Sequence, residues 1–280
     1  MTAFGTDLIG LALEEDIGPG DVTTEIFAGT PSMARARIVA RQDCVFSGGE
    51  VAREVWKRVS PAIRILSVQP EGTLLVSGES AMEVEGPAAS LLSAERVALN
   101  FLQRLSGVAT LTRQYVEAIR GTPAKILDTR KTTPGLRALE KAAVRAGGGT
   151  NHRMGLHDMV MVKDNHLAAV GGIPGLQPAI DEAKRRGLRV EIEVDTIVQL
   201  NEVLALRGVD VVLLDNMSPD LLRQAVELRK PGVAFEASGG ITLENIAAVA
   251  ATGVDFISVG ALTHSAVCVD LALDFVPYSR

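Results

Sequence analysis

The 280-residue sequence predicts an α/β protein, with a parallel α/β barrel in its second half and a smaller α+β layer before it. Short apolar runs alternate with stretches of helical period after residue 120, which is typical of parallel strands joined by right-handed crossovers. Each run ends on a polar or very small residue, as strands do at the active face of a barrel. The first 108 residues alternate short strands without regular helices, which favours a separate α+β layer.

The N-terminal part is expected to hold one longer strand and one helix ahead of the barrel. Ala34–Arg41 alternates apolar and polar side chains with period two, which predicts a half-buried strand. A helix is predicted over Gly49–Val59. Two further helices, Ser90–Leu105 and Ala109–Arg120, are expected to connect this part to the barrel. Shorter strands, separated by turns, are predicted at Ile63–Val68, Thr73–Val76 and Met82–Val84.

Six apolar runs are the predicted barrel strands, and helix signals lie between the later ones. Thr196, Ser218 and Thr242 are predicted N-caps, because a side-chain oxygen at that position accepts a hydrogen bond from the first turn of a helix. Glycines such as Gly187 and Gly208 are predicted to end helices. The strands are predicted at Lys125–Asp128, Met159–Lys163, Val190–Asp195, Val211–Asp215, Ala234–Ser238 and Phe256–Gly260.

Composition and charge exclude several classes of protein. The chain is 47% hydrophobic and 22% charged, which is ordinary for a globular protein and unlike a disordered or collagen-like one. A formal charge of −6 argues against nucleic acid or an anionic membrane as partner. Two cysteines, Cys44 and Cys268, form neither a disulfide framework nor a zinc motif, and the first residues lack the basic segment of a signal peptide. We therefore expect a cytoplasmic protein.

The charge is distributed unevenly along the chain. Residues 130–166 hold seven cations and three anions, a net charge of +4, which leaves −10 for the remainder. A local positive field in an acidic protein suits a small anionic molecule better than a polymer. Within this segment, Arg137, Lys141 and Arg145 are interpreted as one solvated helix face, because their spacing is i, i+4 and i+8.

Five cationic side chains are candidates for binding anions, because they follow predicted strands or lie beside the glycine run Gly147–Gly149. Arginine holds a carboxylate or phosphate through a bidentate fork, and lysine binds it as a point charge. The glycines allow a sharp turn or a close approach of the backbone. The five candidates are Arg130, Lys131, His152, Arg153 and Lys163.

Two carboxylates and a glycine-rich turn complete the predicted face. Glu193 and Asp215 lie at different strand ends, where carboxylates suit ribose hydroxyls, a hard cation such as Mg²⁺, or general acid–base chemistry. Ser238–Gly240, with Gly260 on the next strand, has the arrangement in which backbone N–H groups bind a phosphate after the last strands of a barrel. Together these groups fit a substrate with several anionic groups and a sugar phosphate.

Five motifs along the chain are distinctive when taken together: Glu15–Thr24, Ser106–Thr110, Asp128–Arg137, Gly147–Arg153 and Lys163–His166. They closely resemble the quinolinate phosphoribosyltransferase family, the decarboxylating nicotinate-nucleotide pyrophosphorylases. The resemblance extends over nearly the whole chain. The combination of motifs is highly specific, although no single motif is.

The resemblance implies an N-terminal α/β sandwich domain over residues 1–108 and an incomplete parallel α/β barrel over residues 109–271, with residues 272–280 a candidate to rejoin the sandwich. It implies a homodimer in which each active site borrows from its neighbour, with higher assembly left open. The implied reaction joins quinolinate to phosphoribosyl pyrophosphate and gives nicotinate mononucleotide, pyrophosphate and CO₂ in de novo NAD biosynthesis. Mg²⁺ is the implied cofactor.

The resemblance also implies roles for individual residues. Lys163, Glu193 and Asp215 form the catalytic set, with the two carboxylates contacting the metal directly or through pyrophosphate and water. Arg96 matches the arginine that the partner subunit contributes. The implied quinolinate site comprises Arg96, Thr129, Arg130, Lys131, His152, Arg153 and Lys163, and the implied phosphoribosyl pyrophosphate site comprises Lys131, Glu193, Asp215, Ser238, Gly239, Gly240 and Gly260.

The chemistry of the implied reaction agrees with these residues. A pyridine nitrogen carries its own lone pair, so its attack on the anomeric carbon needs no general base, and positioning and charge stabilisation are expected to dominate. Glu193 and Asp215 are then expected to stay ionised. The alkylated nitrogen is positively charged and stabilises the ring carbanion that loss of CO₂ leaves, and Lys163 is a candidate to assist that step.

Three alternatives remain. A paralogue of the same fold, such as the molybdenum-transport-associated relatives, would act on a different aromatic acid, although Arg153 and Lys163 favour a dicarboxylate. A Schiff-base aldolase would use Lys163 as its nucleophile, but it leaves the glycine turn and the two carboxylates without a role. A metabolite-binding protein would hold quinolinate without turning it over.

Overall fold

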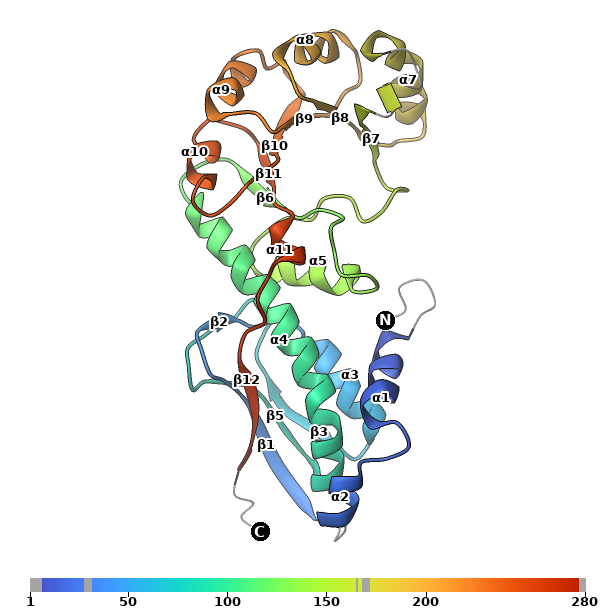
Figure 1. The fold of residues 1–280 in the computed structure, drawn as a ribbon, viewed down its shortest axis with the longest axis vertical. Helices are drawn as coiled ribbons and strands as arrows, with labels where there is room; N and C mark the ends of the chain where they lie inside the picture. The colour runs from blue at the N-terminus through green and yellow to red at the C-terminus, as the bar shows by residue number, and fades with distance from the viewer. Residues whose placement is uncertain (1–6, 28–31, 165, 168–171, 277–280) are drawn as a thin grey trace. The chain divides into compact units, whose positions relative to one another are not determined.

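The computed structural model describes residues 7–27, 32–164, 166–167 and 172–276. The chain divides into two compact units, and each is described by itself (Figure 1). Asn165 and the last part of the predicted C-terminal return, residues 277–280, lie outside the described residues. The first unit comprises residues 1–113, 133–148 and 266–280, and the second comprises residues 114–132 and 149–265.

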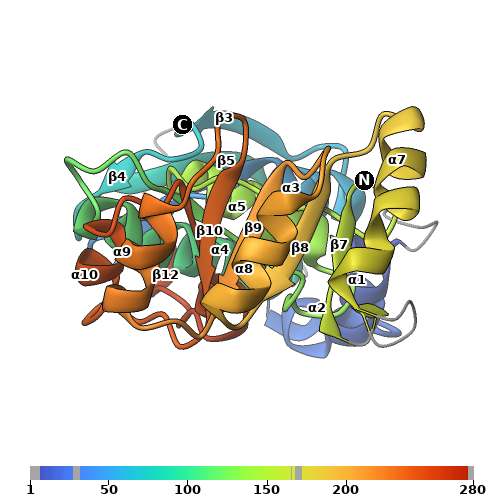
Figure 2. The same ribbon diagram turned by 90° about the horizontal axis from the view of Figure 1, so that it is seen from above.

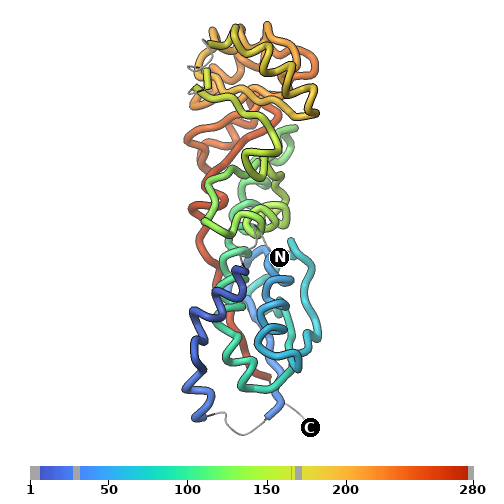
Figure 3. Tube along the Cα trace, turned by 90° about the vertical axis from the view of Figure 1, so that its right-hand side faces the viewer, coloured from blue at the N-terminus to red at the C-terminus, as the bar shows by residue number. Residues whose placement is uncertain are grey.

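The first unit is built on a four-stranded antiparallel sheet with the order β12-β1-β5-β3. Strand β1 (Met33–Ala40) pairs with β5 (Ser80–Pro87) on one side and with β12 (Leu271–Val276) on the other, so the red C-terminal strand returns to the N-terminal unit (Figure 3). The remaining elements of this unit are β2 (Cys44–Val45), β3 (Arg64–Val68), β4 (Leu74–Leu75), α1 (Leu8–Ile17), α2 (Val22–Phe27), α3 (Gly49–Val59), α4 (Ala88–Ala118, which continues into the second unit) and α5 (Arg137–Ala146).

Helices α3 and α4 lie over this sheet (Figure 1). Trp56 of α3 and Leu91 of α4 are fully buried, and Met82 of β5 is nearly so. Apolar side chains on the facing sides of helix and sheet therefore form the core of the first unit, which is the packing expected of a two-layer sandwich.

Two predictions for the first unit are wrong, and one predicted strand is longer than the observed one. The two helices predicted before and after Ser106 are one continuous helix, α4, because Gly107 marks close packing and not a helix end. A Cβ atom at Gly107 would lie 2.2 Å from the carbonyl oxygen of Val267. The strand predicted at Thr73–Val76 is reduced to the two residues of β4. Lys141, interpreted as part of a solvated face, is fully buried in α5.

The second unit contains a six-stranded parallel sheet with the order β6-β11-β10-β9-β8-β7. Helices α8, α9 and α10 cover its outer face (Figures 1 and 2). Strands β6 and β7 are the two edges of the sheet, which makes it the incomplete barrel that the family resemblance implies. Its elements are β6 (Lys125–Leu127), β7 (Val160–Val162), η1 (Ile173–Leu176), α7 (Gln177–Arg185), β8 (Val190–Val194), α8 (Ile197–Ala205), β9 (Val211–Asp215), α9 (Pro219–Glu227), β10 (Ala234–Ser238), α10 (Ile246–Ala250), β11 (Phe256–Ser258) and α11 (Ala261–His264).

Two of the three predicted N-caps are confirmed. The Thr196 side chain accepts a hydrogen bond from the Gln199 N–H in a capping box, and the Ser218 side chain accepts one from the Leu221 N–H. Thr242 is not a cap, because a turn separates it from α10, whose N-cap is Asn245. Caps therefore fix the starts of α8 and α9 directly after the ends of β8 and β9.

Candidate active site

One cavity of about 640 Å³ in the second unit gathers the predicted site residues. It brings together every predicted site residue except Arg96: Thr129, Arg130, Lys131, His152, Arg153, Lys163, Glu193, Asp215, Ser238, Gly239, Gly240 and Gly260. Sequence reasoning missed nine further lining residues: Met161, Leu213, Asn216, Glu236, Ile241, Thr242, Ser258, Ala261 and His264.

The alternation of side chains along the parallel strands explains why these residues meet. Glu193 of β8 is in register with Leu213 of β9, and Asp215 of β9 is in register with Ser238 of β10. Side chains two residues apart share one face of a strand, so Leu213 and Asp215 both point to the cavity. The intervening Leu214 is fully buried, as expected for the opposite, helix-covered face.

The buried carboxylate of Asp128 links the loop after β6 to the loop before β7 through hydrogen bonds. These two loops carry most of the cations of the cavity. Asp128, which directly follows β6, accepts hydrogen bonds from the backbone N–H of His152 (2.9 Å) and from the Asn151 side chain (2.5 Å). The hydroxyl of Thr263 donates to the carbonyl oxygen of Lys131 at 2.8 Å. The cationic loops therefore have fixed backbones beneath their side chains.

Arg153 is half-buried, and the two atoms that its guanidinium contacts are neutral. Its guanidinium donates to the Met159 carbonyl oxygen (3.3 Å) and contacts the Met161 sulfur (3.2 Å). Burial, and next the positive charge of Arg130, lower the pKa of Arg153, although the group stays charged. Two neighbouring cations in a partly desolvated cavity favour an anionic ligand, because that ligand relieves their repulsion.

Carboxylates gather on the part of the cavity wall around Lys163. The Lys163 ammonium forms an ion pair with Glu193, whose side chain is only 14% exposed. Burial, followed by the charges of Asp164 and Asp215, raises the pKa of Asp195. This wall therefore carries excess negative charge, which suits hydroxyl groups and a hydrated cation.

The glycine turn after β10 cannot carry side chains. Gly239 and Gly240 have φ angles of +92° and +59°, in the left-handed region that favours glycine. A Cβ atom at Gly239 would lie 2.1 Å from the Asn216 side-chain oxygen. Without side chains, this turn lets a ligand approach the backbone N–H groups, as in the turns that form anion-binding nests.

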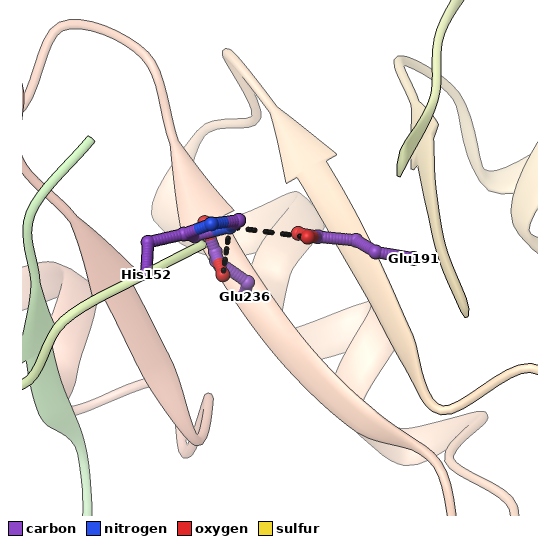
Figure 4. A group of neighbouring side chains, drawn as sticks. All are labelled: His152, Glu191 and Glu236. Carbon is purple, nitrogen blue, oxygen red and sulfur yellow. Dashed lines mark ion pairs between the residues drawn. The ribbon is translucent and has the colours of Figure 1, made fainter. Parts of the chain in front are cut away.

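The predicted site residue His152 faces two carboxyl groups that were not predicted, those of Glu191 and Glu236 (Figure 4). Nε2 of His152 lies 3.1 Å from a Glu191 oxygen and 3.6 Å from a Glu236 oxygen, and both carboxyls are almost fully buried. Burial, and next the charge of Glu191, raise the pKa of Glu236 to about 8. The available signal was a charged residue inside an apolar strand, two positions before Glu193 in one case and before Ser238 in the other.

Arg96 is the predicted site residue that this cavity does not include. It lies exposed on α4, in the part of that helix that belongs to the first unit. Its assignment to the site of a partner subunit therefore stays a prediction.

Two family models match the chain, one for each half. The model described as "Quinolinate phosphoribosyl transferase, N-terminal domain" matches residues 21–106, and the model for the C-terminal domain of the same enzyme matches residues 108–274. Together they cover almost all of the chain.

Individual relatives agree with the family models. The chain is 46% identical over 260 residues to a probable nicotinate-nucleotide pyrophosphorylase (carboxylating) of Bacillus subtilis (strain 168), covering 93% of this chain and 89% of that protein. It is 44% identical over 274 residues to the nicotinate-nucleotide pyrophosphorylase (carboxylating) of Mycobacterium leprae (strain TN), covering 96% of each. The solved structure of the Francisella tularensis nicotinate-nucleotide pyrophosphorylase matches with a TM-score of 0.91 at 39% identity, covering 96% of this chain and 95% of that one.

Proposed function

The chain belongs to the quinolinate phosphoribosyltransferase family, and from this premise we propose how its cavity performs the reaction. The enzyme joins quinolinate to phosphoribosyl pyrophosphate and forms nicotinate mononucleotide, pyrophosphate and CO₂ in NAD biosynthesis. The observation that carries this function is that cations, carboxylates and a glycine turn line one cavity in the same unit. The cations match the carboxylates of quinolinate, the carboxylates match the ribose and the metal-bound pyrophosphate, and the glycine turn matches the 5′-phosphate.

The two carboxylates of quinolinate bind the cationic wall. Arg130 and Arg153 suit a carboxylate each, since a guanidinium offers a planar pair of donors, while Thr129, Lys131 and His152 complete the surroundings. Arg96 of the partner subunit would add a further cation to this wall. A monocarboxylate would leave part of the positive set without a counter-charge, which favours the dicarboxylate over other aromatic acids.

The phosphoribosyl group binds the other two walls. The backbone of Ser238–Gly240, together with Gly260, takes the 5′-phosphate, because the two glycines carry no side chain that would keep the phosphate from the backbone N–H groups. Glu193 and Asp215 take the ribose hydroxyls. The excess of carboxylates on that wall fits Mg²⁺, which Glu193 and Asp215 would hold directly or indirectly. The metal would neutralise charge on the departing pyrophosphate.

The protein residues act mainly by positioning and by charge. The pyridine nitrogen attacks the anomeric carbon with its own lone pair, so no group is needed as a base. Lys163 forms an ion pair with Glu193, which suits a charge that stabilises a carboxylate better than the neutral-amine nucleophile of a Schiff-base aldolase. After ribosylation the positive ring nitrogen stabilises the electron pair that the breaking C–CO₂ bond leaves on the adjacent ring carbon. That carbon then takes up a proton in place of the lost CO₂, with Lys163 near the ring.

We place the enzyme in the cytoplasm as a homodimer with shared sites, with domain boundaries at residues 108 and 271. Both described cysteines are free thiols, which fits a reducing compartment. Within the described residues, no helix combines the length and the apolar character needed to cross a membrane.

A comparison of three alternative substrates tests the dicarboxylate assignment. Initial rates are measured with quinolinate, with nicotinate and with the 2-carboxylate isomer picolinate, at saturating phosphoribosyl pyrophosphate and Mg²⁺. Quinolinate should exceed both monocarboxylates in kcat/KM by at least about a hundredfold, because losing one carboxylate leaves a cationic group unpaired. Equal values for quinolinate and a monocarboxylate would contradict the assignment.

A further inference from the structure

The carboxyl groups of Glu191 and Glu236 form a buried pair beneath the cationic wall. The residues are only 1% and 2% exposed, and their side-chain oxygens lie with His152 Nε2 in a group no more than 4.8 Å across. The Oε1 atoms of Glu191 and Glu236 have no hydrogen-bond partner among the described residues, and Oε2 of Glu191 lies 3.1 Å from His152 Nε2. Two buried carboxylates at this distance repel each other strongly, so a proton on one of them satisfies both the charge and the missing donor.

The orientation of His152 is fixed from both sides of its ring. The backbone N–H of Arg153 donates to Nδ1 at 2.7 Å, which makes Nδ1 an acceptor and assigns the ring proton to Nε2. Nε2 faces the carboxyl pair at 3.1 Å and 3.6 Å. The His152 ring therefore links the carboxyl pair to the backbone of Arg153.

We propose that Glu236 is a neutral carboxylic acid that donates its proton to the Glu191 carboxylate, and that this pair positions His152 and Arg153 for binding quinolinate. Neither glutamate touches the reacting atoms in this scheme, so both are positioning residues. The proposal rests on the proposed function, since it names what holds the quinolinate wall in place.

Because of the charges around Glu236, its protonation state should affect how tightly the cavity binds an anionic ligand. Glu236 faces Glu191 from β8, His152 from the loop before β7, and the uncharged hydroxyl of Ser258 from β11. The charge of Glu191 also acts on Arg153 in the same loop. On the same faces of their strands, one layer nearer the cavity mouth, lie Lys163 and Glu193, which pair with each other, and Asp215. Ionisation of Glu236 would add an unbalanced negative charge directly below the wall that holds a dianion.

The elevated pKa of Glu236, about 8, sets the pH range in which this charge develops. Above that pH, the wild-type Kd for quinolinate should rise by up to about tenfold per pH unit, because one proton must be taken up on binding. Replacing Glu236 by Gln keeps the neutral, hydrogen-bonding form at every pH. Glu236→Gln should therefore bind within about threefold of wild type at pH 7 and should lose the alkaline decline, since an amide cannot ionise.

The test is isothermal titration calorimetry with quinolinate at pH 6.5 to 9.5, for wild type, Glu236→Gln and Glu236→Ala. Glu202→Gln, an exposed glutamate of α8, is the matched control and should follow the wild-type pH profile. Glu236→Ala should lose affinity at every pH, because it leaves Glu191 without its donor. The double variant Glu191→Gln/Glu236→Gln should bind more weakly than Glu236→Gln, because no carboxylate then faces His152.

Three results would overturn the proposal. The first is the same alkaline decline in Glu236→Gln as in wild type. The second is a loss of affinity in Glu236→Gln at pH 7 that equals the loss in Glu236→Ala. The third is one equivalent of tightly bound metal in purified wild type, measured by elemental analysis, that is absent from Glu236→Gln, because the group would then be a metal site.

A ligand-free measurement separates this proposal from the proposed function. Glu236 binds its proton more tightly in the folded state, so its contribution to stability is complete at acidic pH and declines as pH rises toward about 8. The melting temperature of Glu236→Gln minus that of wild type should therefore increase between pH 5 and pH 8. If this relative rise is observed but the protein does not bind quinolinate, the neutral carboxylic acid is supported and only the proposed substrate is rejected. No rise would reject the neutral carboxylic acid itself.

Discussion

Arg153 combines the two properties that a carboxylate-binding residue requires. Its guanidinium is half-buried, and the partners it contacts, the Met159 carbonyl and the Met161 sulfur, are neutral. Burial strengthens a charge–charge interaction because water screens it less. A carboxylate that reaches Arg153 therefore gains more than it would from a solvated arginine.

Replacing Arg153 by Ala should weaken quinolinate binding by about 2–5 kcal/mol, at least about thirtyfold in Kd, because the ligand carboxylate loses its buried partner. The measurement is calorimetric titration with quinolinate. Arg189→Ala, an exposed arginine directly before β8, is the control and should bind as wild type does. An unchanged Kd in Arg153→Ala, with the far-UV circular dichroism of wild type, would remove Arg153 from the site.

Sequence patterns located the charged residues at strand ends but not those within strands. Glu193, Asp215 and Ser238 were found because each ends an apolar run, and all three line the cavity. Glu191 and Glu236 lie inside such runs, where a charged residue also fits a solvent-facing strand position. Only the curvature of the sheet and the path of the loop before β7 bring His152 against them, and neither is encoded in a local pattern.

At the scale of secondary structure, the glycine turn after β10 depends on its backbone conformation. Gly239 has a φ angle of +92° and lies against the Asn216 side chain. Gly239→Ala should raise the KM for phosphoribosyl pyrophosphate by at least about tenfold and destabilise the fold by about 1–3 kcal/mol, because alanine tolerates neither the conformation nor the contact.

Gly232 provides the matched control for the turn. It also has a positive φ angle, +84°, but a Cβ atom there would meet no atom within 4 Å. Gly232→Ala should therefore cost stability without changing the KM. The measurements are steady-state kinetics and urea denaturation, and an equal KM in both variants would exclude a phosphate-binding role for the turn.

Element boundaries were predicted best where caps or strand ends define them. The predicted bounds of α3, β9 and β10 match those observed, and Thr196 caps α8 as predicted. The prediction failed within α4, because glycine at position 107 signals a helix end in a local pattern but serves close backbone packing in the fold. Long-range packing of this kind has no local signature.

At the scale of the whole molecule, the position of Arg96 makes a prediction about assembly. Arg96 is exposed on α4 and is absent from the residues that line the cavity. If a partner subunit supplies it, Arg96→Ala and Lys163→Ala proteins should each be inactive alone. A heterodimer of the two would hold one native site, so a random mixture should recover about a quarter of wild-type activity. Purified heterodimers, made with two affinity tags, without activity would contradict shared sites.

The central claim is that this chain catalyses the complete reaction and does not only bind quinolinate. The most direct test supplies carboxyl-labelled quinolinate, phosphoribosyl pyrophosphate and Mg²⁺, and follows nicotinate mononucleotide by chromatography together with released CO₂. We predict equimolar nicotinate mononucleotide, CO₂ and pyrophosphate, with no product when Mg²⁺ is removed by chelation. Tight binding of quinolinate with neither product at any enzyme concentration would contradict the account and identify a metabolite-binding protein.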